Sequence, residues 1–265
     1  METGNAPAGR SAHAQLSGPA YHGGFATRYG ALRPEPPDDL FAVLLSLAPA
    51  DPPGLVVDLG TGTGSSAVGW PGRARHTVGI ELNPDMLGAA VRASGLRYVQ
   101  ASALRTGLSA GCADIVTCAQ SFHWLDASPA IAEIARILRP GGLFAAYDYD
   151  WPPLASWAVD AAFLRVIEAS GVDPSRPDKA RHVHALLDSG RFRAVREIFL
   201  HARRVAQADQ IAQLPRVFGP VSRRLDEGAT MRELGLDQYE EAVRSCLNPG
   251  ANTIWWSYRV RLAIK

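Results

Sequence analysis

The sequence predicts an α/β fold built on a parallel sheet. Two observations predict it: short apolar segments alternate with helix-like segments over residues 38–150, and one apolar segment, 55–57, leads into a glycine-rich turn. Alternation of strands and helices indicates parallel strands joined by helical crossovers. A strand, a glycine turn and a helix in this order form a ligand site at the carboxyl edge of such a sheet. We therefore expect a cofactor site directly after residue 57.

The elements of this core follow one another at short intervals. Apolar residues at helical spacing predict a first helix over 38–47, which ends before a proline-rich stretch. Short apolar runs predict strands at 55–58, 77–81, 97–100, 114–119 and 143–147. Helical segments are expected between them at 65–70, 84–93 and 129–138. Each of these segments is long enough to connect two neighbouring strands.

The pattern changes after residue 150, where helical segments become longer than strands. Strands are expected at 195–200 and 253–264, and helices over 154–190 and 207–247. Residues 1–20 are rich in Gly, Ala, Pro and Ser, lack the pattern of a signal peptide, and are expected to form a flexible tail. We expect residues 21–265 to form one domain, with a core of 38–150 and 191–265 and helical segments at 151–190 and 207–247.

Composition excludes several classes of partner. The chain has 265 residues and a net charge of +1, which argues against a nucleic-acid-binding surface. No apolar run is long enough to cross a bilayer, so no membrane partner is expected. The three cysteines are too scattered for a disulfide framework or a zinc site, and we expect no metal. A cytoplasmic monomer or homodimer is the simplest expectation.

The glycine turn itself leaves two kinds of cofactor open. Gly62, Gly64 and Ala67 fit a nicotinamide fingerprint, G-x-G-x-x-G/A. Asp58 stands between the strand and the helix, however, and a carboxylate there would repel a pyrophosphate and suit a cationic or zwitterionic ligand. Glu81 ends the second strand about 20 residues further on, where an acid accepts hydrogen bonds from ribose hydroxyls. Both features together favour an adenosine ligand that carries a positive charge.

Three motifs in this order resemble the class I S-adenosylmethionine (SAM)-dependent methyltransferases. They are Val-Asp-Leu-Gly-Thr-Gly-Thr-Gly at 57–64, Gly-Ile-Glu-Leu-Asn-Pro-Asp-Met-Leu at 79–87 and Leu-Arg-Pro-Gly-Gly at 138–142, within a region of similarity at 55–148. The segments 120–126 and 33–37 further resemble a branch of small-molecule methyltransferases that includes the trans-aconitate type. This similarity implies a Rossmann-like, mostly parallel sheet of seven strands with an antiparallel edge strand, the last two strands pairing antiparallel. It also implies that the helical segments 151–190 and 207–247 form a cap or lid, with 207–247 over the mouth of the active site.

The resemblance also implies a set of cofactor contacts. It places the SAM tail against Gly60, Thr61 and Gly62, with Asp58 beside them. It assigns Glu81 to the ribose hydroxyls and Leu82 and Met86 to the adenine, although Met86 also suits core packing. The remaining cofactor positions that it suggests are Ser102, Ala103, Gln120 and Arg33.

Two of these positions depart from the family pattern. The acid that normally follows the third strand is replaced by Ala101-Ser102-Ala103, and Ser102 offers the adenine amine only an uncharged acceptor. Arg33 could bind the SAM carboxylate, but the tyrosines that usually flank it are missing and Tyr29 is the nearest one. A solvated arginine in a proline-rich loop is the alternative for Arg33.

Aromatic and titratable residues after the fourth and fifth strands predict the acceptor side. His123 is a candidate general base for a hydroxyl, phenol or indole; for a carboxylate acceptor it would only shape the pocket. Trp124, Tyr149 and Trp151, together with Tyr29, are candidate pocket residues for a flat, apolar small molecule.

These expectations lead to one function and two alternatives. The leading hypothesis is methyl transfer from SAM to the carboxylate, hydroxyl or aromatic carbon of a metabolite, with S-adenosyl-L-homocysteine (SAH) as the product. A protein of this fold that binds SAM without transferring the methyl group, as a cyclase or a binding protein, would carry the same cofactor motifs. An NAD-dependent oxidoreductase is disfavoured by Asp58 and by the segment 138–142.

Overall fold

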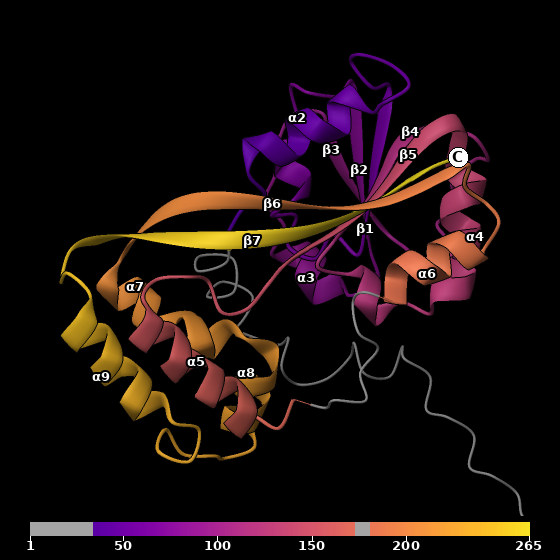
Figure 1. Cartoon of the computed structure of the whole chain (residues 1–265). Coiled ribbons are helices and arrows are strands. Elements are labelled where there is room, and N and C mark those ends of the chain that lie inside the picture. The colour runs from indigo at the N-terminus through magenta and orange to yellow at the C-terminus, as the bar shows by residue number, and fades with distance from the viewer. Residues whose placement is uncertain (1–33, 173–180) are drawn as a thin grey trace, which may run out of the picture.

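Seven strands form a single sheet in the order β3-β2-β1-β4-β5-β7-β6 (Figure 1). The computed structural model describes residues 34–172 and 181–265. The strands are β1 (Leu55–Leu59), β2 (His76–Glu81), β3 (Leu96–Gln100), β4 (Ala113–Ala119), β5 (Leu138–Tyr149), β6 (Ala194–Gln207) and β7 (Ala251–Ile264). The first five are mutually parallel, as the alternation of strands and helices predicts.

Strand β1 lies at the centre of the parallel part and is buried on both faces. Val57 is in register with Val78 of β2 on one side and with Val116 of β4 on the other. Val56 packs into the cluster that contains α2 (Asp38–Ser46), whereas Val57 packs into the cluster that contains α4 (Ala127–Ile137). Successive side chains of a strand point to opposite faces, so the apolar run anchors both helical layers and directs its carboxyl end to the glycine turn.

The two longest strands, β6 and β7, pair antiparallel along their whole length. Strand β7 also runs antiparallel to β5, so it lies between β5 and the edge strand β6. These findings confirm the mixed sheet with an antiparallel pair at one edge. Strand β5 covers only the segment 258–264 of β7, and the remaining part of the β6–β7 pair extends beyond the sheet as a ribbon.

A group of helices packs against the far end of this ribbon (Figure 1). It consists of α5 (Trp157–Ala169), α7 (Ala208–Gln213), η5 (Leu214–Val217), α8 (Gly219–Asp226) and α9 (Leu236–Cys246). Trp256 and Tyr258 of β7 share one buried cluster with Phe163 of α5 and Tyr239 of α9. The other helix after residue 150, α6 (Arg181–Asp188), contributes Leu186 to the core cluster of α4.

Two expected helices are shorter than predicted. In place of a helix over 65–70 there is one 3-10 turn, η3 (Ala67–Gly69), because it ends at a glycine and Pro71 and Gly72 follow shortly after. Helix α3 (Pro84–Gly88) ends five residues before the predicted boundary, at a glycine. Its start is well defined, since the Asn83 side chain accepts hydrogen bonds from the backbone at the first turn.

Strand β5 begins at Leu138, five residues before the predicted start at 143, so the Pro-Gly-Gly segment 140–142 lies within the strand. Its pairing with β4 shifts register between Ala113 and Ile115.

Over residues 34–172 and 181–265, no helix is long and apolar enough to cross a membrane.

Candidate functional site

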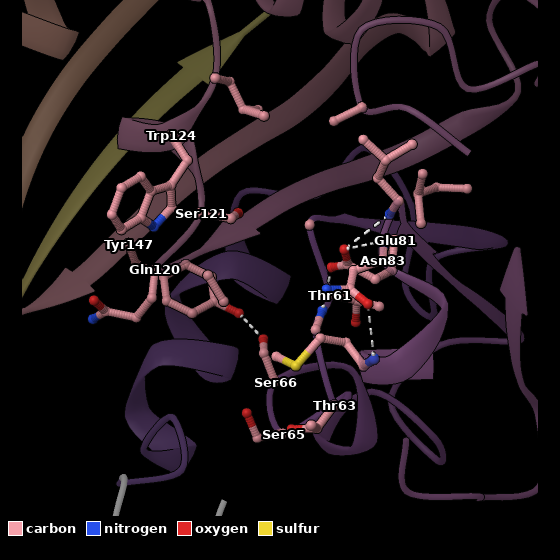
Figure 2. A pocket seen from close by; sticks show the side chains of 18 of the residues that line it. Thr61, Thr63, Ser65, Ser66, Glu81, Asn83, Gln120, Ser121, Trp124 and Tyr147 are labelled. Carbon is pink, nitrogen blue, oxygen red and sulfur yellow. Dashed lines mark hydrogen bonds between the residues drawn. The ribbon is translucent and has the colours of Figure 1, made fainter. Parts of the chain in front are cut away.

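A cavity of about 370 Å³ lies at the carboxyl ends of the parallel strands (Figure 2). Its size is within the range of small-molecule sites. Each of the five parallel strands contributes to it through its last residues or the loop that follows, in the segments 60–66, 80–86, 101–103, 119–125 and 147–149. The sheet topology therefore brings together residues that are far apart in the sequence.

The glycine turn forms one wall of the cavity. Gly60 and Gly62 have φ angles of +66° and +58°, a region in which side chains are disfavoured. A Cβ atom at Gly60 would lie 2.7 Å from Cβ of Ser121. The Ser121 hydroxyl in turn donates to the carbonyl of Leu59 at 2.6 Å, which fixes the turn against the loop after β4. Gly60, Thr61 and Gly62 all line the cavity, where the sequence analysis expects them.

Asp58 lies behind this turn and is not among the residues that line the cavity. Its carboxylate is completely buried and accepts hydrogen bonds from the hydroxyls of Thr61 at 2.8 Å and Thr117 at 2.6 Å. Burial raises the pKa of Asp58 to about 6, and the two threonine hydrogen bonds oppose that shift. The described contacts make Asp58 a support for Thr61 from behind the turn, and its direct contact with a cofactor stays a prediction.

Glu81, at the end of β2, faces the glycine turn. One carboxylate oxygen accepts from the backbone N–H of Gly62 at 2.8 Å, and the other accepts from the N–H groups of Leu82 and Asn83, both at 2.9 Å. An ionised carboxylate has about four acceptor positions, so Glu81 keeps capacity for a ligand hydroxyl. Leu82 is half-exposed and Met86 is buried, and both line the cavity next to it.

The loop after β3 supplies a small and apolar surface. Ala101, Ser102 and Ala103 line the cavity. The Ser102 hydroxyl accepts a hydrogen bond from the N–H of Leu104 at 3.2 Å, which holds the loop in a turn. Since none of these three side chains is charged, this part of the cavity suits a flat group with few charges.

The loop after β4 carries residues with different exposure to the cavity. Gln120 has a φ angle of +54°, which is unusual for a residue with a side chain, and it lines the cavity together with Trp124. His123 is not among the lining residues. Its Nδ1 lies 3.2 Å from Oδ1 of Asp148, on strand β5, and its side chain is 20% exposed.

Strand β5 brings two tyrosines to the cavity. Tyr147 and Tyr149 are two residues apart, so they point to the same face of the sheet, and both line the cavity. Trp151 does not line it. Its ring packs on Trp256, Phe163 and Phe218 in the aromatic cluster below the ribbon, because the strand has ended and the chain turns away.

Several lining residues were not predicted from the sequence. They include Thr63, Ser65, Ser66, Asn83, Tyr147 and Tyr258. Strand alternation predicts Tyr147 once Tyr149 is assigned, but Tyr258 could not be found in this way. It comes from β7, and only the pairing of Tyr149 with Tyr258 across the sheet places it here.

Some expectations fall outside what the structure describes. Tyr29 and Arg33 lie outside the described residues, although Pro34 and Pro36, which follow them, line the cavity. No described lining residue comes from 157–247, so the lid role of these helices stays a prediction. Within the described ranges, no group of three or more His, Cys, Asp or Glu side chains could hold a metal ion.

Comparison with known families identifies the central part of the chain. Residues 57–146 match the model of the methyltransferase domain family. This range begins within β1 and ends within β5, so it contains the glycine turn and Glu81.

Relatives with assigned names are similar over the same part. A demethylmenaquinone methyltransferase of Thermus thermophilus is 36% identical over 126 residues, which is 44% of this chain and 56% of the relative. A trans-aconitate 2-methyltransferase of Azoarcus sp. is 36% identical over 118 residues, 41% of this chain and 46% of the relative. An uncharacterized methyltransferase of Mycobacterium tuberculosis is 38% identical over 89 residues, only 36% of its own length. The matched region therefore spans between a third and somewhat more than half of these relatives.

Solved structures share the fold over nearly the whole chain. A candidate type II methyltransferase from Anaeromyxobacter dehalogenans has a TM-score of 0.68 at 24% identity and covers 88% of this chain and 97% of its own. A phosphoethanolamine N-methyltransferase of Haemonchus contortus, solved with S-adenosyl-L-methionine, has a TM-score of 0.55 at 16% identity and covers 97% of this chain and 60% of its own. The seven-stranded sheet is thus the Rossmann-like fold of the class I methyltransferases.

Proposed function

We propose that this chain, which carries a methyltransferase domain on the class I fold, transfers a methyl group from SAM to a small-molecule acceptor. The observation that carries the proposal is the position of Glu81: its carboxylate meets the N–H of Gly62 at one wall of a cavity formed by the ends of all five parallel strands. An acid beside a glycine turn at this edge is the arrangement that binds the ribose of an adenosine ligand.

The described residues fit such a cofactor. Gly60, Thr61 and Gly62 present backbone without a covering side chain, and Glu81 offers an acceptor for ribose hydroxyls. Leu82 and Met86 supply apolar contact for an adenine, and Ser102 and Ala103 line the same cavity. SAM, when bound, supplies an activated methyl group on a sulfonium cation, and the protein's task is to align the acceptor and exclude water.

The opposite wall is aromatic and suits an apolar acceptor. Figure 2 shows Trp124 and Tyr147 across the cavity from Glu81 and Asn83. Tyr149 and Tyr258 complete this wall from β5 and β7. Aromatic rings form one wall of the cavity, and polar and acidic groups form the opposite wall. This arrangement predicts a flat acceptor that binds against the aromatic wall and presents its reacting atom from that side.

His123 enters the proposal as a candidate general base for a hydroxyl acceptor. A neutral imidazole that carries its proton on Nδ1, toward Asp148, has its basic lone pair on Nε2, an arrangement in which a carboxylate orients the ring. Because His123 does not line the cavity, this role requires the acceptor or the ring to approach. A carboxylate acceptor needs no base, and His123 would then only support the turn that carries Trp124.

Cofactor binding can be tested by thermal shift and calorimetry with SAH, SAM and NAD. We expect SAH to raise the melting temperature and NAD to leave it unchanged. Glu81→Gln should weaken SAH binding about tenfold or more, as the loss of charged hydrogen bonds does. The matched control is Glu168→Gln, because Glu168 is an exposed acid on α5 that does not line the cavity. Stabilisation by NAD without any effect of SAH would overturn the proposal.

Methyl transfer needs a separate measurement. Release of SAH from SAM in the presence of a metabolite extract, fractionated until one acceptor remains, would identify the substrate. A protein that binds SAH tightly but releases none with any fraction would support the binding or cyclase alternative instead.

A further inference from the structure

The loop after the glycine turn is connected to strand β5 by one pair of side chains. The hydroxyl of Ser66 forms a hydrogen bond with the hydroxyl of Tyr147, 81 positions further along the chain (Figure 2). Both side chains are buried and both residues line the cavity. The bond therefore joins the cofactor wall to the aromatic wall of the same cavity.

The loop that contains Ser66 has no long helix after it, so the hydrogen bond to Tyr147 supplies order that a helix would otherwise give. Most of the loop's backbone bonds are short-range: Gly64 N–H to the carbonyl of Thr61 at 2.9 Å, Val68 N–H to that of Gly64 at 3.0 Å, and Gly69 N–H to that of Ser66 at 3.1 Å. One backbone bond reaches it from outside, from the N–H of Val91 to the carbonyl of Thr63 at 3.0 Å. Only the three-residue η3 follows. A single turn of this kind is weakly stable by itself, so its order depends on contacts from outside: the backbone bond from Val91 to Thr63 and the side-chain bond between Ser66 and Tyr147.

The chemistry of Tyr147 suits a permanent hydrogen bond. Burial raises the pKa of this phenol well above its usual value, and the nearby charge of Asp58 raises it further. The hydroxyl thus stays protonated at neutral pH. The tyrosine ring is in turn fixed by strand β5, whose pairing places Tyr147 opposite Val260 of β7 and next to Ala119 of β4. One partner of the bond is therefore on a strand that is paired on both sides.

We propose that the Tyr147 hydroxyl is a positioning group for cofactor binding, because it holds Ser66 and thereby the conformation of the loop 63–67. This inference rests on the proposed function and adds a residue to it. A loop that is already ordered loses less conformational entropy when a ligand binds. Tyr147 acts through Ser66 and takes no part in the chemical step.

The test is a double-mutant cycle with Tyr147→Phe, Ser66→Ala and the double variant. Each single substitution removes one of the two hydroxyls and leaves the rest of the side chain in place. We expect each single variant to weaken SAH binding about fivefold, the effect of one lost hydrogen bond. The double variant should lose no more than either single one, since the two hydroxyls serve the same bond. In turnover assays of both single variants, the KM for SAM should rise by a larger factor than kcat falls.

Tyr239→Phe is the matched control. Its hydroxyl is also buried and donates to a backbone carbonyl, that of Ile211, at 2.8 Å, but Tyr239 does not line the cavity. It should lower the melting temperature to a similar extent without changing SAH affinity. If Tyr147→Phe fails to fold, Ser66→Ala alone decides the question.

Two results separate the inference from the proposed function. Wild-type protein that binds SAH, combined with unchanged affinity in Tyr147→Phe and Ser66→Ala, would overturn the positioning role alone; so would additive losses in the double variant. Wild-type protein that binds no SAH would overturn the proposed function and this inference with it.

Discussion

Nδ1 of His123 lies 3.2 Å from Oδ1 of Asp148, and the same buried carboxylate pairs with Arg261 of β7. The Arg261 side chain is completely buried and reaches Glu197 of β6 at 3.5 Å. The imidazole beside the cavity is thus connected to a row of charges that crosses β5, β7 and β6. Its position is set by the antiparallel edge of the sheet as well as by its own loop.

If His123 acts as the general base, His123→Ala should lower the methylation rate about 100-fold or more while leaving SAH affinity nearly unchanged. The physical reason is that no base remains to accept the proton of the acceptor, whereas the residues proposed to bind the cofactor are unchanged. Rates at saturating SAM and calorimetry with SAH measure the two effects. His201→Ala is the control, because His201 is an exposed histidine on β6 whose Nδ1 lies 2.9 Å from Oγ of Ser257. Full turnover of His123→Ala on the true acceptor would remove His123 from catalysis.

Breaking the buried ion pair should cost far more stability than breaking an exposed one. Arg261→Met leaves Asp148 buried without this guanidinium, and we expect a loss of about 3–5 kcal/mol in the free energy of unfolding. Arg73→Met breaks the pair with Asp38, whose side chain is 89% exposed, and should cost about 0–1 kcal/mol. Urea unfolding followed by circular dichroism measures both. Equal losses in the two variants would contradict the importance of the buried network.

The third glycine of the turn is expected to be irreplaceable for two separable reasons. Gly64 has a φ angle of +80°, and a Cβ atom there would lie 1.9 Å from the hydroxyl oxygen of Tyr98. Gly72 has a similar φ of +86° but nothing within 4 Å of its Cβ position. Gly72→Ala should therefore cost about 1–2 kcal/mol of folding free energy, from backbone strain alone.

Gly64→Ala should cost about 1–3 kcal/mol more than that, from the clash. Adding Tyr98→Phe removes the nearest clashing atom and should recover part of this difference. Thermal or urea unfolding of the three variants gives the comparison. Equal effects of the two glycine substitutions would show that Tyr98 moves aside freely.

The buried carboxyl of Asp58 predicts a dependence of stability on pH. Its pKa is raised from 3.8 to about 6 by burial, so the folded state holds the proton more tightly than the unfolded chain does. This contribution to stability is fully present below about pH 4 and is lost as the pH rises to about 6. Relative to Asp58→Asn, the wild type should lose about 3 kcal/mol of unfolding free energy over this window. Urea titrations between pH 4 and 7 measure the difference.

Glu133 provides a comparison of opposite sign. The Arg136 guanidinium lowers the pKa of this carboxyl from 4.5 to about 2, helped by hydrogen bonds from Thr106. Its contribution is present above about pH 4.5 and is lost as the pH falls toward 2. Relative to Glu133→Gln, the wild type should therefore lose stability on acidification, whereas Asp58 loses it on alkalinisation. The same sign for both residues would contradict the assigned environments.

Local sequence patterns were sufficient for the parallel half of the fold. The apolar runs around Val57 and Val116 predicted their strands to within a residue or two, because a strand buried on both faces needs a continuous apolar segment. Prediction was poorer where propensity is weak. The stretch after Gly64 contains further glycines and a proline, and no long helix forms there. The hydrogen bond between the hydroxyls of Ser66 and Tyr147 could not be predicted from this local pattern.

Local sequence patterns located the predicted cofactor side of the cavity, because the glycine turn and Glu81 follow consecutive strands and the carboxyl ends of parallel strands meet at one edge. Which side chains face that edge depends on how the distant strands pack together. Asp58 is directed behind the turn by Thr61 and Thr117, Trp151 turns into the aromatic cluster, and Tyr258 arrives from β7. Most of these orientations depend on contacts between strands that are far apart in the sequence, 59 residues for Asp58 and Thr117 and more than 100 for Tyr149 and Tyr258, and no local pattern of residues encodes such contacts.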